Sequence, residues 1–346
     1  MRAVVYDGPR SFAVREVPTP EPTAGQVRVR VVQTGVCGTD LHLHEGRFMA
    51  AYPMVPGHEV VGVVDALGDG VDGVEGVAGV AVGELVAVNP NAACGTCEYC
   101  REGRALLCDA LTGIGSNLPG GFAEHVVAPA AQVFSVEGLD VDTAVLTEPT
   151  SCAAHAVDVI APRHGSTALV IGAGPTGVLL AQLLRGSGAS KVTVAAPTAF
   201  KLERATALGV DATYLMDRGD LAGDVQALLR RSGGSGYDVV VDATGAAVVA
   251  EVLVPLTRSG GTAVFYGVTD EEDRVAVSPY DVFRRELTIK GSFAEISSFP
   301  AAIAAMRSGR VRTDGLVTHR FGLDDYGLAL EALRSDRTAH KVVVVP

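Results

Sequence analysis

Four cysteines stand close together in the stretch CGTCEYCREGRALLC. Their spacing is C-x2-C-x2-C-x7-C, and they are Cys94, Cys97, Cys100 and Cys108. Thiolates at such short spacing typically surround one tetrahedral zinc ion and leave no coordination position open for a substrate. Four thiolates also suit an iron–sulfur cluster, whereas disulfides are disfavoured in a reducing compartment. We therefore expect a structural zinc ion at these cysteines, with the iron–sulfur cluster as the alternative.

A second set of metal-binding side chains is divided between two turns. GVCGTD supplies Cys37, and VPGHE supplies His58 and Glu59, each beside a strand-like run. A thiolate, an imidazole and a carboxylate form a zinc site of the catalytic kind, in which one position stays open for water or substrate. The spacing alone does not pair Cys37 with His58, because each residue type is more often structural when it occurs singly.

A glycine-rich loop follows the strand-like run TALVI. VIGAGPTG carries three glycines in the pattern G-x-G-x-x-G, Gly172, Gly174 and Gly177. Between a strand and a helix these glycines permit a tight turn and let a pyrophosphate approach the N–H groups of the helix. The loop therefore predicts a dinucleotide site, and we expect further contacts from Pro175 and Thr176 and, after a later strand, from Thr244.

The acidic residue that normally binds the ribose of NAD is absent. It is expected about 20 residues beyond the loop, where this chain has Ala196. A carboxylate there accepts hydrogen bonds from the ribose and repels the additional phosphate of NADP. Thr198 and Lys201 follow within one turn, and they offer a hydroxyl and a cation for charge-assisted bonds to that phosphate. We therefore predict that the protein prefers NADP, with NAD as the alternative.

The elements that must position these groups fall into two regions. The first 150 residues alternate valine-rich strands with Gly/Pro turns, which is typical of a β barrel or partly open sheet. The next region alternates strand-like and helix-like runs, as a doubly wound parallel sheet does. The chain ends in a closing strand, HKVVVVP. The predicted fold is α/β, with a β-rich domain formed by 1–150 and 296–346 and a nucleotide-binding domain at 151–295.

Composition and charge narrow the function classes. A chain of 346 residues is long enough for two domains. Its net charge of -12, without a Lys/Arg run, gives little support to nucleic-acid or membrane partners. The N-terminal MRAVVYDGPRS lacks an apolar signal core, so we expect a cytoplasmic protein. The Gly-Val-rich stretch 68–84 is expected to be a surface hairpin loop without a function of its own.

The order and spacing of these motifs, together with EPTSC, resemble those of the zinc-dependent medium-chain alcohol/polyol dehydrogenases, the sorbitol and threonine dehydrogenase-like family. The resemblance extends essentially from end to end. It implies a GroES-like catalytic domain, a Rossmann domain, and a homodimer or homotetramer. It also implies that Cys37 and His58 bind a catalytic zinc ion and that Glu148 replaces a third thiolate. Glu59 corresponds to a glutamate that binds or exchanges at the metal, so the last ligand can be Glu59, Glu148 or water.

The resemblance further implies a proton relay. Thr39 would hydrogen-bond the substrate oxygen, and His42 would pass the proton towards solvent through the cofactor ribose. Asp40 would orient His58 as the hydrogen-bond partner of this ligand. Hydride leaves the alcohol carbon for the nicotinamide ring. Sorbitol-type relatives have Phe-Arg-Tyr after Gly-Ser, but here Gly-Ser is followed by Phe-Ala-Glu, so the arginine that grips substrate hydroxyls is missing.

These features favour a zinc- and NADP-dependent dehydrogenase of a secondary alcohol, such as a polyol or sugar alcohol, acting reversibly on a small molecule. The alternative within the same fold is an NAD-linked dehydrogenase of a diol or amino alcohol, of the butanediol or threonine type. A non-catalytic nucleotide-binding redox sensor would keep the glycine loop. It would have no reason to retain the ligand and relay residues together.

Overall fold

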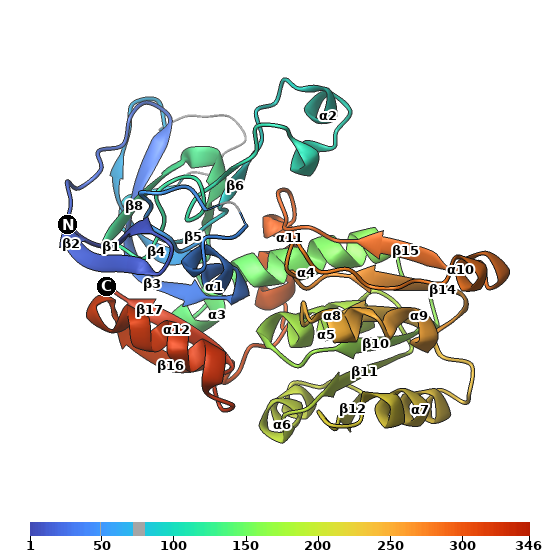
Figure 1. Cartoon of the computed structure of the whole chain (residues 1–346). Helices are drawn as coiled ribbons and strands as arrows, with labels where there is room; N and C mark the ends of the chain where they lie inside the picture. The colour runs from blue at the N-terminus through green and yellow to red at the C-terminus, as the bar shows by residue number, and fades with distance from the viewer. Residues whose placement is uncertain (49, 72–79) are drawn as a thin grey trace. The chain divides into compact units, whose positions relative to one another are not determined.

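The computed structural model describes residues 1–48, 50–71 and 80–346 (Figure 1). Residues 72–79 of the expected hairpin at 68–84 therefore lie outside the described residues. The chain divides into two compact units, which are treated separately below. The first unit comprises Met1–Ser151, Glu295–Arg307 and Leu316–Pro346, and the second comprises Cys152–Ala294 and Ser308–Gly315.

The first unit is built on a seven-stranded sheet in which β17 is bonded to β3, β3 to β4, β4 to β5 and β5 to β9. β16 lies at one edge beside β17, and β8 also pairs with β3. The strands are β3 (Gln26–Val36), β4 (Glu59–Leu67), β5 (Leu85–Val88), β8 (His125–Pro129), β9 (Val133–Ser135), β16 (Val317–Gly322) and β17 (Lys341–Val345). Alternate residues of β3, namely Val27, Val29 and Val31, are buried in one core, as the period of a strand requires.

Short elements complete the first unit. β1 and β2 form a separate hairpin, and β6 pairs with β7. Their bounds, with those of the helices, are β1 (Arg2–Gly8), β2 (Ser11–Glu16), β6 (Asn91–Ala92), β7 (Thr112–Gly113), α1 (Gly38–His44), α2 (Glu98–Arg101), α3 (Val141–Ala144), α11 (Phe299–Arg307) and α12 (Tyr326–Ser335). The closing strand β17 is hydrogen-bonded into the sheet beside β3, and it belongs to the first unit. α4 (Thr147–Ile160) begins in this unit.

The second unit contains a six-stranded parallel sheet in the order β12-β11-β10-β13-β14-β15 (Figure 1). This order is that of the doubly wound dinucleotide-binding fold, which confirms the predicted α/β class. The strands are β10 (Thr167–Ile171), β11 (Lys191–Ala196), β12 (Ala212–Leu215), β13 (Tyr237–Asp242), β14 (Thr257–Phe265) and β15 (Thr288–Gly291). The helices are α5 (Pro175–Gly186), α6 (Ala199–Ala207), α7 (Leu221–Arg231), α8 (Ala247–Ala250), α9 (Leu253–Leu256) and α10 (Pro279–Arg284).

The C-terminal segment differs from the sequence-based boundaries at Ser308–Gly315, which packs with the second unit. The reason is a pair of hydrogen bonds to α5. The backbone N–H of Arg312 donates to Gln182 Oε1 at 2.8 Å, and Gln182 Nε2 donates to the carbonyl of Arg312 at 3.0 Å. Hydrogen bonds between a side chain and the backbone leave no hydrophobic pattern in the sequence. The sequence therefore does not indicate which unit this segment joins. Among the described residues, none of the helices has the length and apolar character needed to cross a bilayer.

Candidate active site

Cys37 occupies the N-cap of α1, directly after β3. Its side chain accepts a hydrogen bond from the backbone N–H of Thr39 at 3.3 Å, and its own N–H donates to Asp40 Oδ2 at 2.9 Å. This reciprocal arrangement is a capping box in which a thiol takes the place of the usual hydroxyl. The cap fixes the direction of the Cys37 side chain at the start of the helix.

The fold brings His58 to Cys37, a pairing that the spacing left open. β3 and β4 are antiparallel neighbours, and Gly35 lies opposite Glu59, so the ends of the two strands meet. Cys37 Sγ lies 3.1 Å from His58 Nε2. The potential ligand atoms of Cys37, His58 and Glu59 all lie within 4.8 Å of one another. A partly buried set of one thiolate, one imidazole and one carboxylate has the donor chemistry of a catalytic zinc site.

Glu148 lies in the first turn of α4, outside that compact set of three. Its negative charge nevertheless acts on the site, because it contributes to raising the pKa values of His58 and Lys341. The structure thus places Glu148 within electrostatic range of the site. Its direct ligation of zinc stays a prediction.

Asp40 is fully buried behind His58. Its Oδ1 lies 3.8 Å from His58 Nδ1 and has no hydrogen-bond partner among the described residues. Burial raises the pKa of Asp40. Burial also opposes protonation of His58, but the charges of Cys37 and Asp40 outweigh it, and the pKa of His58 rises well above its ordinary value. The site therefore attracts positive charge at His58, which a bound divalent cation would supply in place of the proton.

Thr39 and His42 both lie on α1, three residues apart, so they share one face of this helix. Both side chains are only partly buried. This placement suits the proton relay that the resemblance implies, although its contacts with substrate and cofactor stay a prediction.

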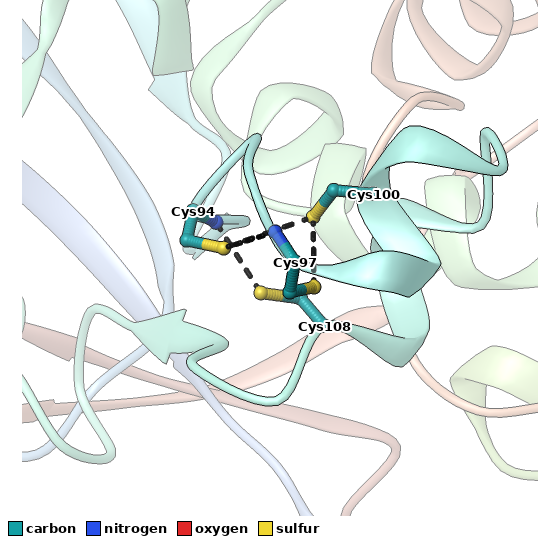
Figure 2. A group of neighbouring side chains, drawn as sticks. All are labelled: Cys94, Cys97, Cys100 and Cys108. Carbon is teal, nitrogen blue, oxygen red and sulfur yellow. Dashed lines mark hydrogen bonds between the residues drawn. The ribbon is translucent and has the colours of Figure 1, made fainter.

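The four-cysteine stretch forms a compact cluster, drawn in Figure 2. The potential ligand atoms of all four cysteines lie within 4.8 Å of one another, and Sγ of Cys97 lies 3.5 Å from Sγ of Cys100. Backbone N–H groups point at the sulfurs: Cys94 donates to Cys108 Sγ at 3.3 Å, and Cys97 donates to Cys94 Sγ at 3.4 Å. Hydrogen bonds from Thr96 and Cys97 lower the pKa of Cys94 to about 6. A set of four thiols with a stabilised thiolate fits a closed tetrahedral metal site.

Two glycines shape the nucleotide loop and the third leaves it open. Gly172 has φ +121°, and a Cβ atom there would lie 2.9 Å from the carbonyl oxygen of Ala243. A Cβ atom at Gly177 would overlap the carbonyl oxygen of Gly172. At Gly174, by contrast, a Cβ atom would meet nothing within 4 Å. Gly174 is the N-cap of α5 and makes no side-chain cap, so the space beside the helix N-terminus is free for a pyrophosphate.

The remaining predicted cofactor residues surround this loop within the second unit. Pro175 is the first residue of α5, and Thr176 follows it. Thr244 follows β13, and its hydroxyl donates to Asp242 Oδ1 at 2.6 Å. Its Cγ2 is also among the atoms nearest to a Cβ built at Gly172, at 3.1 Å. The structure therefore brings Thr244 to the glycine loop, although the two are far apart in the sequence.

Ala196 is the buried last residue of β11, and Thr198 is the N-cap of α6. The Thr198 side chain makes no capping hydrogen bond, and the first turn of α6 contains no acidic residue. Lys201 lies in that turn and is partly buried. The N-terminus of α6 therefore combines a positive dipole end with a cation, and both attract an anionic group.

The sequence analysis assigned no role to Lys341 or Glu295, two buried charged residues of the first unit. Lys341 opens β17, and its Nζ forms an ion pair with the carboxylate of Glu59. The available signal was the position of this lysine directly before four valines in a closing strand, where it is expected to be buried. A buried lysine is rare unless it is paired, so its position pointed to a buried acidic partner. Glu295 was noted only for the arginine missing beside it, yet it is fully buried, and its Oε1 has no hydrogen-bond partner in the described part of the chain.

Glu295 is expected to make stability depend on pH. Burial, together with the charge of Glu148, raises the pKa of Glu295 from 4.5 to about 8. The folded chain therefore holds this proton more tightly than the unfolded chain. The resulting stabilisation is fully present below about pH 4.5 and is lost as the pH rises through about 8. At about 1.4 kcal/mol per pKa unit, the loss amounts to several kcal/mol.

The substitution Glu295→Gln keeps the shape of the side chain and removes its titration. We expect the free energy of unfolding of this variant, relative to the unmodified chain, to increase progressively between about pH 5 and pH 8. Denaturant titrations at several pH values measure this difference. Parallel pH profiles for the two proteins would show that Glu295 does not titrate abnormally.

Comparison with known proteins agrees with this geometry. The profile of the alcohol dehydrogenase GroES-like domain matches residues 23–138, and that of the zinc-binding dehydrogenase domain matches residues 175–308. D-arabinitol dehydrogenase 1 of Uromyces fabae is 41% identical over 347 aligned positions, which cover 100% of this chain and 97% of the relative. The chain belongs to the zinc-dependent medium-chain alcohol/polyol dehydrogenase family. It is therefore an NAD(P)-linked alcohol dehydrogenase, and the expected GroES-like and Rossmann folds are confirmed.

Two solved structures resemble this dehydrogenase over its whole length. A zinc-binding dehydrogenase from Sinorhizobium meliloti 1021, bound to NADP, superposes with a TM-score of 0.90 at 33% identity, covering 100% of this chain and 99% of the other. An alcohol dehydrogenase from Escherichia coli CFT073, complexed with NADH, gives a TM-score of 0.89 at 30% identity, again covering 100% and 99%. Zinc and a nicotinamide cofactor are thus those of the family, and a small alcohol is the substrate.

Proposed function

We propose that this dehydrogenase oxidises a secondary alcohol of a polyol or sugar alcohol, with NADP as its preferred oxidant, and catalyses the reverse ketone reduction. The observation that carries the chemistry is the compact set of Cys37, His58 and Glu59 beside α1. The polyol class is supported by the 41% identity with a D-arabinitol dehydrogenase over the whole chain. The four-cysteine cluster, in this proposal, holds a structural zinc ion.

In this mechanism, Cys37 and His58 would hold the catalytic metal, Glu59, Glu148 or water would complete its ligands, and Asp40 orients His58. When bound, zinc polarises the alcohol and the nicotinamide accepts hydride. Thr39 hydrogen-bonds the alcohol oxygen and receives its proton. His42, on the same face of α1, carries the proton towards solvent, which its partial exposure permits. The alcohol thus loses a hydride and a proton and becomes a ketone.

The preference for NADP is supported by Ala196, by Lys201 and by the acid-free first turn of α6. The relative from Sinorhizobium meliloti was solved with NADP. The relative from Escherichia coli was solved with NADH, so an NAD-linked dehydrogenase of a diol or amino alcohol is the second candidate. Fluorescence titration of the protein with NADPH and with NADH separates the two. Tighter binding of NADPH supports the proposal, and equal or tighter binding of NADH contradicts it.

The substitution Ala196→Asp tests the phosphate site directly. A carboxylate at the end of β11 would repel a 2′-phosphate, so we expect the affinity for NADPH to fall by at least about tenfold, equivalent to about 1.4 kcal/mol. Ala207→Asp adds the same charge at the exposed C-terminal end of α6 and serves as the matched control. An unchanged NADPH affinity in the Ala196 variant would remove this residue from the specificity site.

The proposal includes a homodimer or homotetramer formed through the edge of the second unit. β15 is the edge strand of its sheet, which leaves one row of backbone groups available for pairing. On the preceding helix α10, Tyr280 is 70% exposed and Phe283 is 80% exposed. Large apolar side chains so exposed beside a free strand edge suit an interface between copies. The six cysteines, which form no disulfide, are in keeping with a reducing, cytoplasmic location.

A further inference from the structure

A row of three side chains links the end of α1 to the core of the first unit. His44 is the last residue of α1, Tyr6 lies on β1, and Tyr326 is the first residue of α12. The Tyr6 hydroxyl lies 2.8 Å from His44 Nδ1, and the hydroxyl groups of Tyr6 and Tyr326 lie 3.4 Å apart. Three separate elements are therefore joined by one row of hydrogen bonds.

Aromatic rings enclose this row. Tyr6 and Tyr326 are only 2% and 1% exposed. The ring of Phe12 packs edge-on against both His44 and Tyr326, with centroid distances of 6.0 Å and 5.1 Å. Within the described chain, Tyr6 is the only hydrogen-bond partner of the Tyr326 hydroxyl. A change at one end of the row therefore reaches the other end, because a buried hydroxyl without a partner is unfavourable.

The direction of the hydrogen bonds depends on the charge of His44. A neutral imidazole accepts the Tyr6 proton at Nδ1, and the Tyr6 oxygen can then accept the proton of Tyr326. A protonated imidazole has no acceptor atom and donates from Nδ1, so Tyr6 must turn its own proton towards Tyr326. The Tyr326 hydroxyl then loses its acceptor inside the core. Protonation of His44 thus disrupts the row at its buried end.

The surroundings of His44 favour the neutral imidazole. Burial lowers its pKa from the ordinary value of 6.5. The guanidinium groups of Arg334 on α12 and of Arg10 after β1 also lower it, whereas the carboxylate of Glu45 raises it. Both arginines form ion pairs with Glu45, so one carboxylate is shared between two cations. His44 is therefore neutral at pH 7, and it becomes charged when the pH falls below its lowered pKa.

Helix α1 carries side chains that the proposed reaction uses. Thr39 and His42 lie on one face of this helix, which has only seven residues. A tilt at its last turn therefore moves both of them. The backbone of that turn is held by Tyr52, whose hydroxyl donates to the carbonyl of Leu43 at 2.6 Å. His44 holds the same turn through a side chain that can change its charge.

We propose that His44 is a positioning residue: its neutral side chain, bonded to Tyr6, holds the last turn of α1 against the core and so keeps Thr39 and His42 in place for proton transfer. This inference rests on the proposed function. In it, acid weakens catalysis by charging a residue that lies outside the metal-binding set. A merely structural histidine would alter the stability of the fold and leave the pH dependence of kcat unchanged.

The first test compares kcat of the zinc-loaded, full-length protein and its variants between about pH 8 and pH 5, the range in which histidine titrates. D-arabinitol and NADP serve as the probe pair. His44→Asn places an amide oxygen where Nδ1 accepts the Tyr6 proton, and it does not titrate. The kcat of this variant relative to the unmodified protein should be near one at pH 8 and should rise about tenfold towards pH 5, as the row of the unmodified protein is disrupted.

Tyr6→Phe removes the hydrogen bond at every pH and keeps the packing of the ring. Its kcat should be about tenfold below that of the unmodified protein at pH 8, and the difference should shrink towards pH 5. His319→Asn, on β16, is the matched control and should follow the unmodified protein at each pH. Metal analysis at each pH ensures that the compared proteins hold the same amount of zinc.

Hydrogen exchange of the α1 amides gives a second readout that needs no substrate. Protection of residues 38–44 should fall on acidification in the unmodified protein and stay constant in His44→Asn. Equal pH profiles of kcat and of protection in these two proteins would overturn the inference, as would full protection of α1 in Tyr6→Phe. A protein that oxidises no polyol at any pH would instead contradict the proposed function, and the exchange measurement would still decide whether His44 holds α1.

Discussion

Replacing Cys37 by serine is expected to reduce alcohol oxidation by at least about a thousandfold, since zinc contributes about 4 kcal/mol or more to the stabilisation of developing charge. Serine can still accept the hydrogen bond from the backbone N–H of Thr39, so the cap of α1 survives. The soft thiolate ligand is lost. The zinc content should therefore fall by one equivalent while the free energy of unfolding changes little.

The matched control is Cys152→Ser, because Cys152 lies outside both metal-binding groups of the described chain. This variant should keep its zinc and its activity. Metal analysis, steady-state kinetics and denaturant unfolding of the two variants give the comparison. Full activity in Cys37→Ser would show that the set of Cys37, His58 and Glu59 is not the catalytic metal site.

Replacing Cys100 by serine is expected to disorder the lobe around α2 while part of the activity persists. Cys37→Ser, by contrast, is expected to lose activity while the fold persists. The lobe around α2 has little apolar core, and of its four cysteines only Cys108 is buried. Its order must come from the metal, and structural zinc in small domains contributes on the order of 10 kcal/mol to local folding. We expect Cys100→Ser to lose one zinc equivalent and residues 94–108 to lose their protection from hydrogen exchange and proteolysis.

The catalytic site has its own ligands, so residual activity should persist in Cys100→Ser at low temperature. The outcome that contradicts this role is a variant that retains two metal equivalents and a protected lobe. Elemental analysis of the unmodified protein also separates zinc from the iron–sulfur alternative at this cluster.

The parts that could be predicted from sequence are those in which chemistry and spacing are local. The four cysteines lie within one short segment, and the glycine loop needs only a strand before it and a helix after it. The pairing of Cys37 with His58 is different, because it depends on the register between β3 and β4. Sequence alone gave no warrant for it beyond resemblance to the family.

Two other features depend on contacts between distant segments. Lys341 reaches Glu59 only because β17 returns beside β3, and the space for the pair is created by the missing side chain of Gly35. Ser308–Gly315 joins the second unit through hydrogen bonds between Arg312 and Gln182. Neither feature produces a periodic pattern along the chain. Both arise from tertiary hydrogen bonding and charge, which composition and periodicity do not report.

The most direct test is to incubate the zinc-loaded protein with pentitols and hexitols and either NADP or NAD, and to follow the formation of reduced nicotinamide. The account predicts oxidation of at least one polyol, faster with NADP, with the activity lost to a chelator of the catalytic metal and recovered when zinc is added back. A protein that binds nucleotide and about two zinc ions per chain, one for each metal-binding group, yet oxidises no polyol with either cofactor, would contradict it.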